Sequence, residues 1–198
     1  MRLQEAKRDY YRRSAKKEGF RSRAAYKLLE INNSYHIILK GMCVVDLGCA
    51  PGGWLQVAIR GVGSNGKVLG IDMRSVDPLH NVEVIRGAVD DDFLSEKILD
   101  SLGRKASVLL SDLAPNISGI WQLDHARQIS LTQNAVSIAE KILVRNGSVV
   151  LKAFEGKMLN ELRDELKRKF SRVHLYKPRS SRKESSEIYL VCLGYKGS

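Results

Sequence analysis

Residues 43–54, C-V-V-D-L-G-C-A-P-G-G-W, decide the fold. The first five residues are apolar apart from Asp46, and the next seven contain three glycines and one proline. A short apolar run that ends in such a turn is typical of a buried parallel strand. We therefore expect a strand at Cys43–Leu47, followed by a helix at 54–60.

Outward from this stretch, strand-like and helix-like segments alternate. The other expected strands lie at 67–73, 82–86, 107–112, 148–154, 172–177 and 187–194. The other expected helices lie at 3–18, 22–31 with Ser22 as its cap, 92–102, 124–145 with Asn146-Gly147 as its C-cap, and 158–170. This pattern predicts an α/β fold with a seven-stranded, mostly parallel sheet and helices on both faces. The last two strands are joined by a short polar segment, so the last strand is expected to be antiparallel.

Length and composition exclude several classes of protein. A chain of 198 residues with 43% hydrophobic residues suits one domain, 1–198, whose core needs no disulfide or metal to be stable. No apolar run reaches the roughly 18 residues of a membrane span, and the charged N-terminus is no signal peptide. Three cysteines far apart in sequence favour buried thiols in a reducing cytoplasm over disulfides or a zinc site, and no metal is expected.

Positive charge is concentrated in two blocks. The chain has 33 Lys and Arg against 22 Asp and Glu, a net charge of +11. The first block forms a basic helical extension at about 1–20 and continues just beyond it: Arg2, Lys7, Arg8, Arg12, Arg13, Lys16, Lys17, Arg21, Arg23 and Lys27. The second comprises Lys167, Arg168, Lys169, Arg172, Lys177, Arg179, Arg182 and Lys183. One-signed clusters indicate a bound polyanion, for which RNA rather than DNA or a membrane is expected, although a solvated surface is the alternative. Tyr10, Tyr11 and Phe20 could stack on bases.

The ends of the parallel strands are where ligands bind in an open α/β sheet. Here they carry Asp46, Asp72, Asp112 and Lys152. These four residues are therefore the first candidates for chemistry.

Two glycine-rich stretches are candidates for the cofactor-binding turn. Residues 61–66 match G-x-G-x-x-G, but they follow a helix and precede a strand, so we interpret them as a simple turn. The turn at 48–53 leaves a strand and opens a helix, without the spacing or the cation that would hold a pyrophosphate. With Asp72 for ribose hydroxyls and Asp46 for a cationic amino-acid tail, it favours S-adenosylmethionine. A tight turn whose aspartates cap helices is the alternative.

Several motifs resemble one family, the FtsJ/RrmJ heat-shock ribosomal RNA methyltransferases. The similarity runs from about Ser14 to Lys196 and rests on residues 22–31, 46–54, 111–116, 151–156 and 185–190. It implies a Rossmann-like class I methyltransferase fold, S-adenosylmethionine as cofactor, and methylation of a uridine 2′-hydroxyl in large-subunit ribosomal RNA by a protein expected to be monomeric. The family's catalytic tetrad falls on Lys27, Asp112, Lys152 and Glu187. The cofactor residues are expected at Asp46, Gly48, Gly52, Gly53, Trp54, Asp72, Asp90 and Asp112.

The adenine contact departs from the family pattern. The family has Gly-Asp after the third strand, and this chain has Gly87-Ala88-Val89-Asp90. Asp90 is therefore a candidate for the adenine amine, and a contact made by the backbone alone is the other possibility.

Lys152 is the candidate for the base in the reaction. It lies inside the apolar run V-V-L-K-A-F, where a lysine needs a partner or a task. A neutral Lys152 amine could take the proton of a ribose hydroxyl. Burial and Lys27 favour that neutral form, whereas Asp112 and Glu187 favour the charged one. A charged Lys152 that orients the hydroxyl therefore stays open.

Other activities fit the sequence less well. Residues 112–116 contain no aromatic residue to stack a base for N-methylation, and no cysteine is placed for attack on a pyrimidine. Ribose methylation of transfer RNA remains open. So does a non-catalytic role in ribosome assembly, which the presence of all four tetrad residues disfavours. Taken singly, each of the four could instead be a surface charge or a helix cap.

Overall fold

The computed structural model describes residues 2–182 and 184–197, with side chains from Tyr10 onward. Its helices are α1 (Arg2–Lys17), α2 (Ala25–Tyr35), α3 (Gly53–Val62), α4 (Leu94–Leu102), α5 (Trp121–Ile142) and α6 (Leu159–Lys169). Its strands are β1 (Cys43–Leu47), β2 (Lys67–Asp72), β3 (Val82–Arg86), β4 (Ala106–Ser111), β5 (Leu143–Phe154), β6 (Phe170–Tyr176) and β7 (Glu187–Tyr195).

The seven strands form one sheet in the order β3-β2-β1-β4-β5-β7-β6. All neighbours pair in parallel except β7, which is antiparallel to both β5 and β6. The predicted sheet and its antiparallel last strand are confirmed. Strand β7 sits inside the sheet, so residues from the end of the chain lie beside β5.

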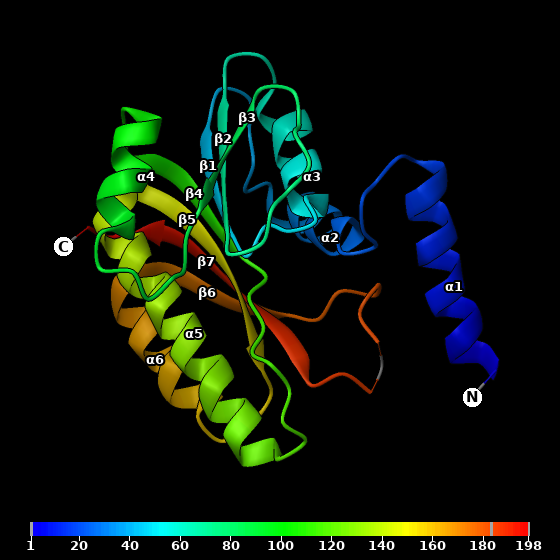
Figure 1. Ribbon diagram of the computed structural model, residues 1–198. Helices are drawn as coiled ribbons and strands as arrows, with labels where there is room; N and C mark the ends of the chain where they lie inside the picture. Colours follow the sequence, from blue (N-terminus) through cyan, green and yellow to red (C-terminus); the bar gives the residue numbers. More distant parts are fainter. Residues whose placement is uncertain (1, 183, 198) are drawn as a thin grey trace.

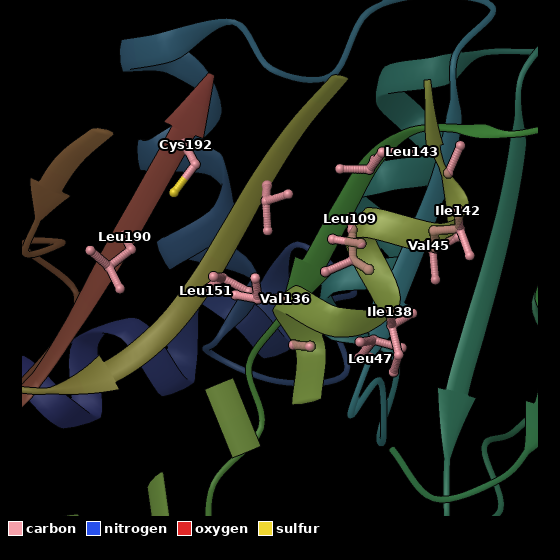
Figure 2. Close-up of a cluster of buried hydrophobic side chains, with 14 of the residues drawn as sticks. Val45, Leu47, Leu109, Val136, Ile138, Ile142, Leu143, Leu151, Leu190 and Cys192 are labelled. Atoms are coloured by element: carbon pink, nitrogen blue, oxygen red, sulfur yellow. The ribbon is translucent and has the colours of Figure 1, made fainter. Parts of the chain in front are cut away.

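Helices cover both faces of the sheet, as predicted (Figure 1). On one face, α4, α5 and α6 pack on apolar side chains that include Leu47, Leu109 and Leu151, part of the cluster drawn in Figure 2. On the other face, α2 and α3 cover Val44, Leu110 and Val150, and α1 lies at the outer edge. Burial of alternate side chains on both faces explains why the central strands read as almost continuous apolar runs.

Two predicted helix caps are wrong. Ser22 is not a side-chain cap: α2 begins at Ala25, Ala24 has no capping side chain, and the helix runs to Tyr35. Asn146-Gly147 is not a helix C-cap, because α5 ends at Ile142 and β5 starts at the next residue. Instead, Asn146 (φ 66°) and Gly147 lie where the pairing of β5 with β4 shifts register. A Cβ atom at Gly147 would stand 2.9 Å from the Val144 carbonyl oxygen, so glycine is required there.

The first block of positive charge lies in or near the predicted helix. Arg12, Arg13, Lys16 and Lys17 are exposed on α1, while the side chains of Arg2, Lys7 and Arg8 are outside the described residues. The second block is split by the fold. At the end of β6 where the strand begins, α6 finishes with Lys167, Arg168 and Lys169. At the other end of β6, the loop that follows the strand carries Lys177, Arg179 and Arg182. Lys183 lies outside the described residues.

Within the described part of the chain, no helix is both long enough and apolar enough to cross a membrane.

Candidate active site

The carboxyl ends of β1, β2, β4 and β5 meet at one edge of the sheet, and the candidate residues gather there. Asp46 lies in β1, Asp72 ends β2, Asp112 follows β4 directly, and Lys152 lies near the end of β5. Glu187 begins β7, which runs antiparallel to β5, so the start of β7 meets the end of β5. Lys27 enters from the first turns of α2 on the other side.

The four tetrad residues form two ion pairs. The Lys27 Nζ atom lies 2.6 Å from Glu187 Oε1, and the Lys152 Nζ atom lies 3.3 Å from Asp112 Oδ1. Lys152 also donates a hydrogen bond of 2.8 Å to the Asp112 carbonyl oxygen. Lys27 and Lys152 are only 8% and 7% exposed, so both charges are desolvated and depend on these partners.

Tyr189 joins the two ion pairs, a role that the sequence did not predict. Its hydroxyl accepts a hydrogen bond of 3.1 Å from Lys27 Nζ and donates one of 2.7 Å to Asp112 Oδ1. Burial, together with Asp112 and Glu187, holds the pKa of Tyr189 well above its usual range, so the hydroxyl keeps its proton. The result is one bonded array: Glu187, Lys27, Tyr189, Asp112 and Lys152.

The sequence contained a signal for Tyr189. In a strand, residues two apart share a face, so Tyr189 follows Glu187 on the same side of β7. It also stands directly opposite Lys152 in the β5–β7 register, a pairing that only the sheet topology reveals.

Asp46 is fully buried, and neither of its carboxylate oxygens has a hydrogen-bond partner among the residues that the structure describes. Burial raises its pKa well above the usual value of 3.8, and the nearby carboxylates of Asp112 and Asp72 raise it further. Desolvation and the charges of Asp46 and Asp72 also raise the pKa of Cys49. Of these three carboxylates, Asp112 pairs with Lys152 and Asp72 with Arg74, so Asp46 is the one without a cationic partner among the described residues, which suits a cationic ligand.

The glycine turn has the shape that the sequence predicts. Gly48 (φ 77°) and Gly52 (φ 108°) adopt backbone conformations that favour glycine. Gly53 begins α3, so the first N–H groups of that helix lack partners within it and can bind an anionic group. The turn at 61–66 lies at the far end of α3, before β2 starts, and is the helix-to-strand turn that its context indicates.

Asp72 and Trp54 lie at the site, but both side chains have protein partners. Asp72 Oδ2 accepts the Ala50 N–H at 2.8 Å, and Oδ1 accepts the Arg74 N–H at 2.8 Å. Oδ1 also accepts the Arg74 Nε–H at 3.4 Å, so Oδ2 is the oxygen that retains a lone pair for a ribose hydroxyl. The Trp54 indole N–H donates to the Ala24 carbonyl oxygen at 2.8 Å. The centre of the Trp54 ring lies 5.8 Å from the centre of the Tyr189 ring. Trp54 is 3% exposed, which leaves its backbone as the part available to a ligand.

Asp90 is the one candidate that the structure does not bring into this group. It is exposed in the turn between β3 and α4. Among the described side chains, it makes none of the ion pairs or hydrogen bonds that order the other candidates.

Side chains of α5 hold the strand ends together, and sequence reasoning did not find them. Gln128 Nε2 donates to the carbonyl oxygens of Leu113, at 3.2 Å, and of Lys152, at 3.0 Å. The Thr132 hydroxyl approaches the Lys152 carbonyl oxygen to 3.0 Å. The signal in the sequence was the spacing of these two polar residues, one helical turn apart. Their burial is known only from the structure.

Phe20 does not stack on a ligand. It is 8% exposed, and the guanidinium of Arg60 lies over its ring at 4.6 Å. Tyr10 is 64% exposed, while Tyr11 is half-buried against Tyr26.

Comparisons with known proteins agree on one family. The sequence profile of the FtsJ-like methyltransferases matches residues 20–195. The chain is 48% identical over 197 residues to "Ribosomal RNA large subunit methyltransferase E" of Nitrosopumilus maritimus, which covers 100% of both chains. It is 47% identical over 195 residues to the protein of the same name from Methanothermobacter thermautotrophicus, covering 98% of this chain and 92% of that one.

Among solved structures, a candidate ribosomal RNA methyltransferase from Plasmodium falciparum is similar throughout. It superposes with a TM-score of 0.82 at 34% sequence identity, covering 90% of this chain and 100% of the other.

Proposed function

Because this chain belongs to the FtsJ-like methyltransferase family, we propose that it transfers a methyl group from S-adenosylmethionine to a uridine 2′-hydroxyl of large-subunit ribosomal RNA. The observation that carries the proposal is the bonded array from Glu187 to Lys152, which lies beside the glycine turn and the three carboxylates. The names of the relatives support ribosomal RNA as the substrate.

The residues present fit S-adenosylmethionine. The unpartnered carboxylate of Asp46 suits the ammonium group of the methionine tail, and the first N–H groups of α3 suit its carboxylate. Asp72 stands at the end of β2, where ribose hydroxyls are bound in such sheets. Asp90 stays a proposal for the adenine, on the exposed turn between β3 and α4. When bound, the cofactor supplies a methyl group already activated by a sulfonium.

Lys152 and Asp112 are placed to handle the acceptor hydroxyl. Lys152 already contacts two oxygens of Asp112, which fixes the amine at the end of β5. From there the amine, in its neutral form, orients the 2′-hydroxyl for in-line attack and takes its proton, while the oxygen bonds to the methyl carbon and the bond from that carbon to the sulfonium sulfur breaks. The Asp112 carboxylate would favour a cationic donor.

Lys27 and Glu187 act as a second pair behind the first. Lys27 is held by Glu187 and reaches Asp112 only through the Tyr189 hydroxyl. We assign this pair the task of holding the Tyr189 hydroxyl, and through it the Asp112 carboxylate, in place beside Lys152.

The substrate approaches across a basic surface. Arg12, Arg13, Lys16 and Lys17 line α1, and the β6–β7 loop adds Arg179. Glu30 of α2 anchors this loop, because its carboxylate accepts the N–H groups of Arg179 at 2.6 Å and Ser180 at 3.0 Å. Tyr11 of α1 lies within electrostatic range of both Glu30 and Arg179. Phosphates of a structured RNA suit such a surface.

The three cysteines support a cytoplasmic location for this activity. Cys43, Cys49 and Cys192 are buried free thiols, which agrees with a reducing compartment.

A single substitution tests the proposal. In the variant Lys152→Ala, methyl transfer from radiolabelled S-adenosylmethionine to large-subunit ribosomal RNA should fall at least about a thousandfold, while cofactor and RNA binding stay near wild type. The matched control is Lys157→Ala, an exposed lysine five residues along the chain.

The product of the wild-type enzyme decides the substrate. Alkali-resistant linkages in ribosomal RNA would support ribose methylation there. Methylation of transfer RNA alone, methylation of a base, or undiminished transfer by Lys152→Ala would overturn the proposal.

A further inference from the structure

The segment between β4 and α5 exposes large apolar side chains beside the candidate active site. Ile117, Ile120 and Trp121, here called the apolar platform, are 66%, 59% and 45% exposed. Residues 113–123 contain no charged side chain, in a protein where more than a quarter of the residues are charged. Figure 1 shows this segment running from the end of β4 to the start of α5, away from α1.

The platform is held in shape by its own contacts. The Asp124 carboxylate accepts hydrogen bonds from the Ser118 N–H at 2.8 Å, the Ser118 hydroxyl at 2.7 Å and the Gly119 N–H at 3.1 Å. These bonds lower the pKa of Asp124 and fix the turn that leads into α5. A surface ordered in advance loses less conformational entropy when it binds.

The Trp121 ring is fixed as well. It lies nearly parallel to His125, with ring centres 5.7 Å apart, and to Phe154, at 6.0 Å. Nearly half of its surface still faces solvent, so the indole is a rigid aromatic surface. Exposed aromatic rings held in this way are what unpaired nucleobases stack on.

The apolar platform is connected to both residues that are proposed to handle the acceptor, Asp112 and Lys152. It follows Asp112 in the chain, and Phe154, which touches Trp121, is two residues beyond Lys152 on β5. Gln128 ties the carbonyl groups of Leu113 and Lys152 together underneath. An RNA whose ribose reaches Lys152 therefore has its neighbouring nucleotides at this surface.

From these observations we infer that the apolar platform stacks an unpaired nucleobase next to the methylated nucleotide, with Trp121 as the stacking ring. The inference rests on the proposed function, because it takes the acceptor to be an RNA ribose at Lys152. The two sides of the site then divide the substrate by its chemistry. The basic surface of α1 and the β6–β7 loop binds phosphates, and the uncharged platform binds a base.

Intrinsic fluorescence offers a direct test. The chain has two tryptophans, and Trp54 is buried, so quenching by RNA reports on Trp121. A short oligouridylate strand should quench the emission, and a strand of the same length with abasic riboses should quench it much less. The lysine variant Lys152→Ala should show the same quenching as wild type, although it transfers no methyl group.

Kinetics give the second readout. Trp121→Ala should raise the KM for ribosomal RNA roughly tenfold and leave the cofactor Kd unchanged, whereas Trp121→Phe should restore most of the loss. Leu39→Ala, at an exposed apolar residue that precedes β1, is the matched control and should behave as wild type.

Each contrary outcome has a distinct meaning. An unchanged KM in Trp121→Ala, or equal quenching by both strands, overturns the platform. Concentration-dependent self-association of the wild type that Trp121→Ala removes identifies a protein contact instead and also overturns it. If the wild type methylates no RNA, the proposed function fails, and the quenching experiment alone decides the platform.

Discussion

Asp46 and Tyr189 show how single residues set the electrostatics of the site. Asp46 carries a carboxylate that nothing in the described part of the protein neutralises, and Tyr189 carries a neutral hydroxyl between a cation and an anion. The Asp46 carboxylate destabilises the folded protein until a cationic ligand binds. The Tyr189 hydroxyl couples the Lys27–Glu187 ion pair to the Lys152–Asp112 ion pair through hydrogen bonds.

We expect Asp46→Asn to separate ligand binding from folding. The folded-state pKa of Asp46 lies above the usual 3.8, so between these two values the folded protein holds more protons than the unfolded chain. The stability of the ligand-free wild type should therefore fall, relative to Asp46→Asn, as the pH rises above about 4. The asparagine variant should bind S-adenosylmethionine at least about tenfold more weakly, because a charge-assisted hydrogen bond is removed.

Urea denaturation of both proteins across this pH range, with calorimetric titration of the cofactor, checks the prediction. Asp100→Asn, at an exposed residue of α4, is the control. Parallel stability curves for wild type and Asp46→Asn would show that Asp46 is not the titrating group.

Tyr189→Phe removes the hydroxyl and leaves both ion pairs in place. We expect kcat to fall about tenfold, equivalent to about 1.4 kcal/mol, with the cofactor Kd unchanged. Fluorescence of Trp54, on which the ring packs, should stay normal if the fold is intact. Tyr195→Phe removes a comparable hydroxyl, which donates to the Glu140 carbonyl oxygen at 3.3 Å, and should leave kcat unaltered.

At the scale of residues, the sequence predicts that polar groups at strand ends gather, and the structure brings Asp112 and Lys152 within 3.3 Å of each other. Asp112 and Lys152 follow from the rule that ligands bind at the carboxyl ends of parallel strands. Tyr189 could not be found in this way, because its importance depends on which strand β7 joins. Its spacing from Glu187 places it on the same face of β7, but that spacing does not reveal the buried cation beside it.

At the scale of elements, α5 acts as a brace between β4 and β5. Gln128 and Thr132 bind carbonyl groups just beyond β4 and near the end of β5, next to the two residues proposed to handle the acceptor. The distance between Asp112 and Lys152 therefore depends on a helix that bonds to neither side chain.

Gln128→Leu should weaken this brace without changing the volume of the side chain greatly. Two buried carbonyl groups lose a donor, although Thr132 remains near one of them, so the free energy of unfolding should fall by about 1–3 kcal/mol. We expect kcat to fall while the KM for RNA changes little. Gln133→Leu, an exposed neighbour on the same helix, should show neither effect in chemical denaturation or in steady-state kinetics.

The sequence predicted which elements exist better than where they end. The strands were found because apolar runs between turns give a strong signal. The end of α5 was missed because Asn146-Gly147 has the composition of a helix cap, and here it forms an irregularity within β5. Local sequence cannot distinguish these two uses of a residue pair that favours a left-handed backbone.

The whole molecule presents different surfaces on the two sides of the site. The basic side combines α1 with the β6–β7 loop, and the split of the second basic block leaves Lys167 and Arg168 far from it. The sequence predicted two basic blocks, but only the topology shows that Lys167 and Arg168 of the second block lie away from the β6–β7 loop.

Replacing Arg12, Arg13, Lys16 and Lys17 together with glutamine should weaken RNA binding. It should also make the logarithm of the binding constant less steep against the logarithm of salt concentration, by about 0.7 for each phosphate that the variant no longer binds. Filter binding at several salt concentrations measures both. Lys167→Gln with Arg168→Gln serves as the control, and an equal weakening in that pair would mean that the effect is one of net charge alone.

Strand β7 has a consequence for the timing of activity. It is the last strand to be synthesised, yet it fills the gap between β5 and β6 and supplies both Tyr189 and Glu187. A nascent chain that has emerged only as far as β6 leaves the edge of β5 open and gives β6 no neighbour. Translation must therefore run almost to the end of these residues before any methyl transfer is possible, and a ribosome stalled shortly before residue 187 carries an inert product.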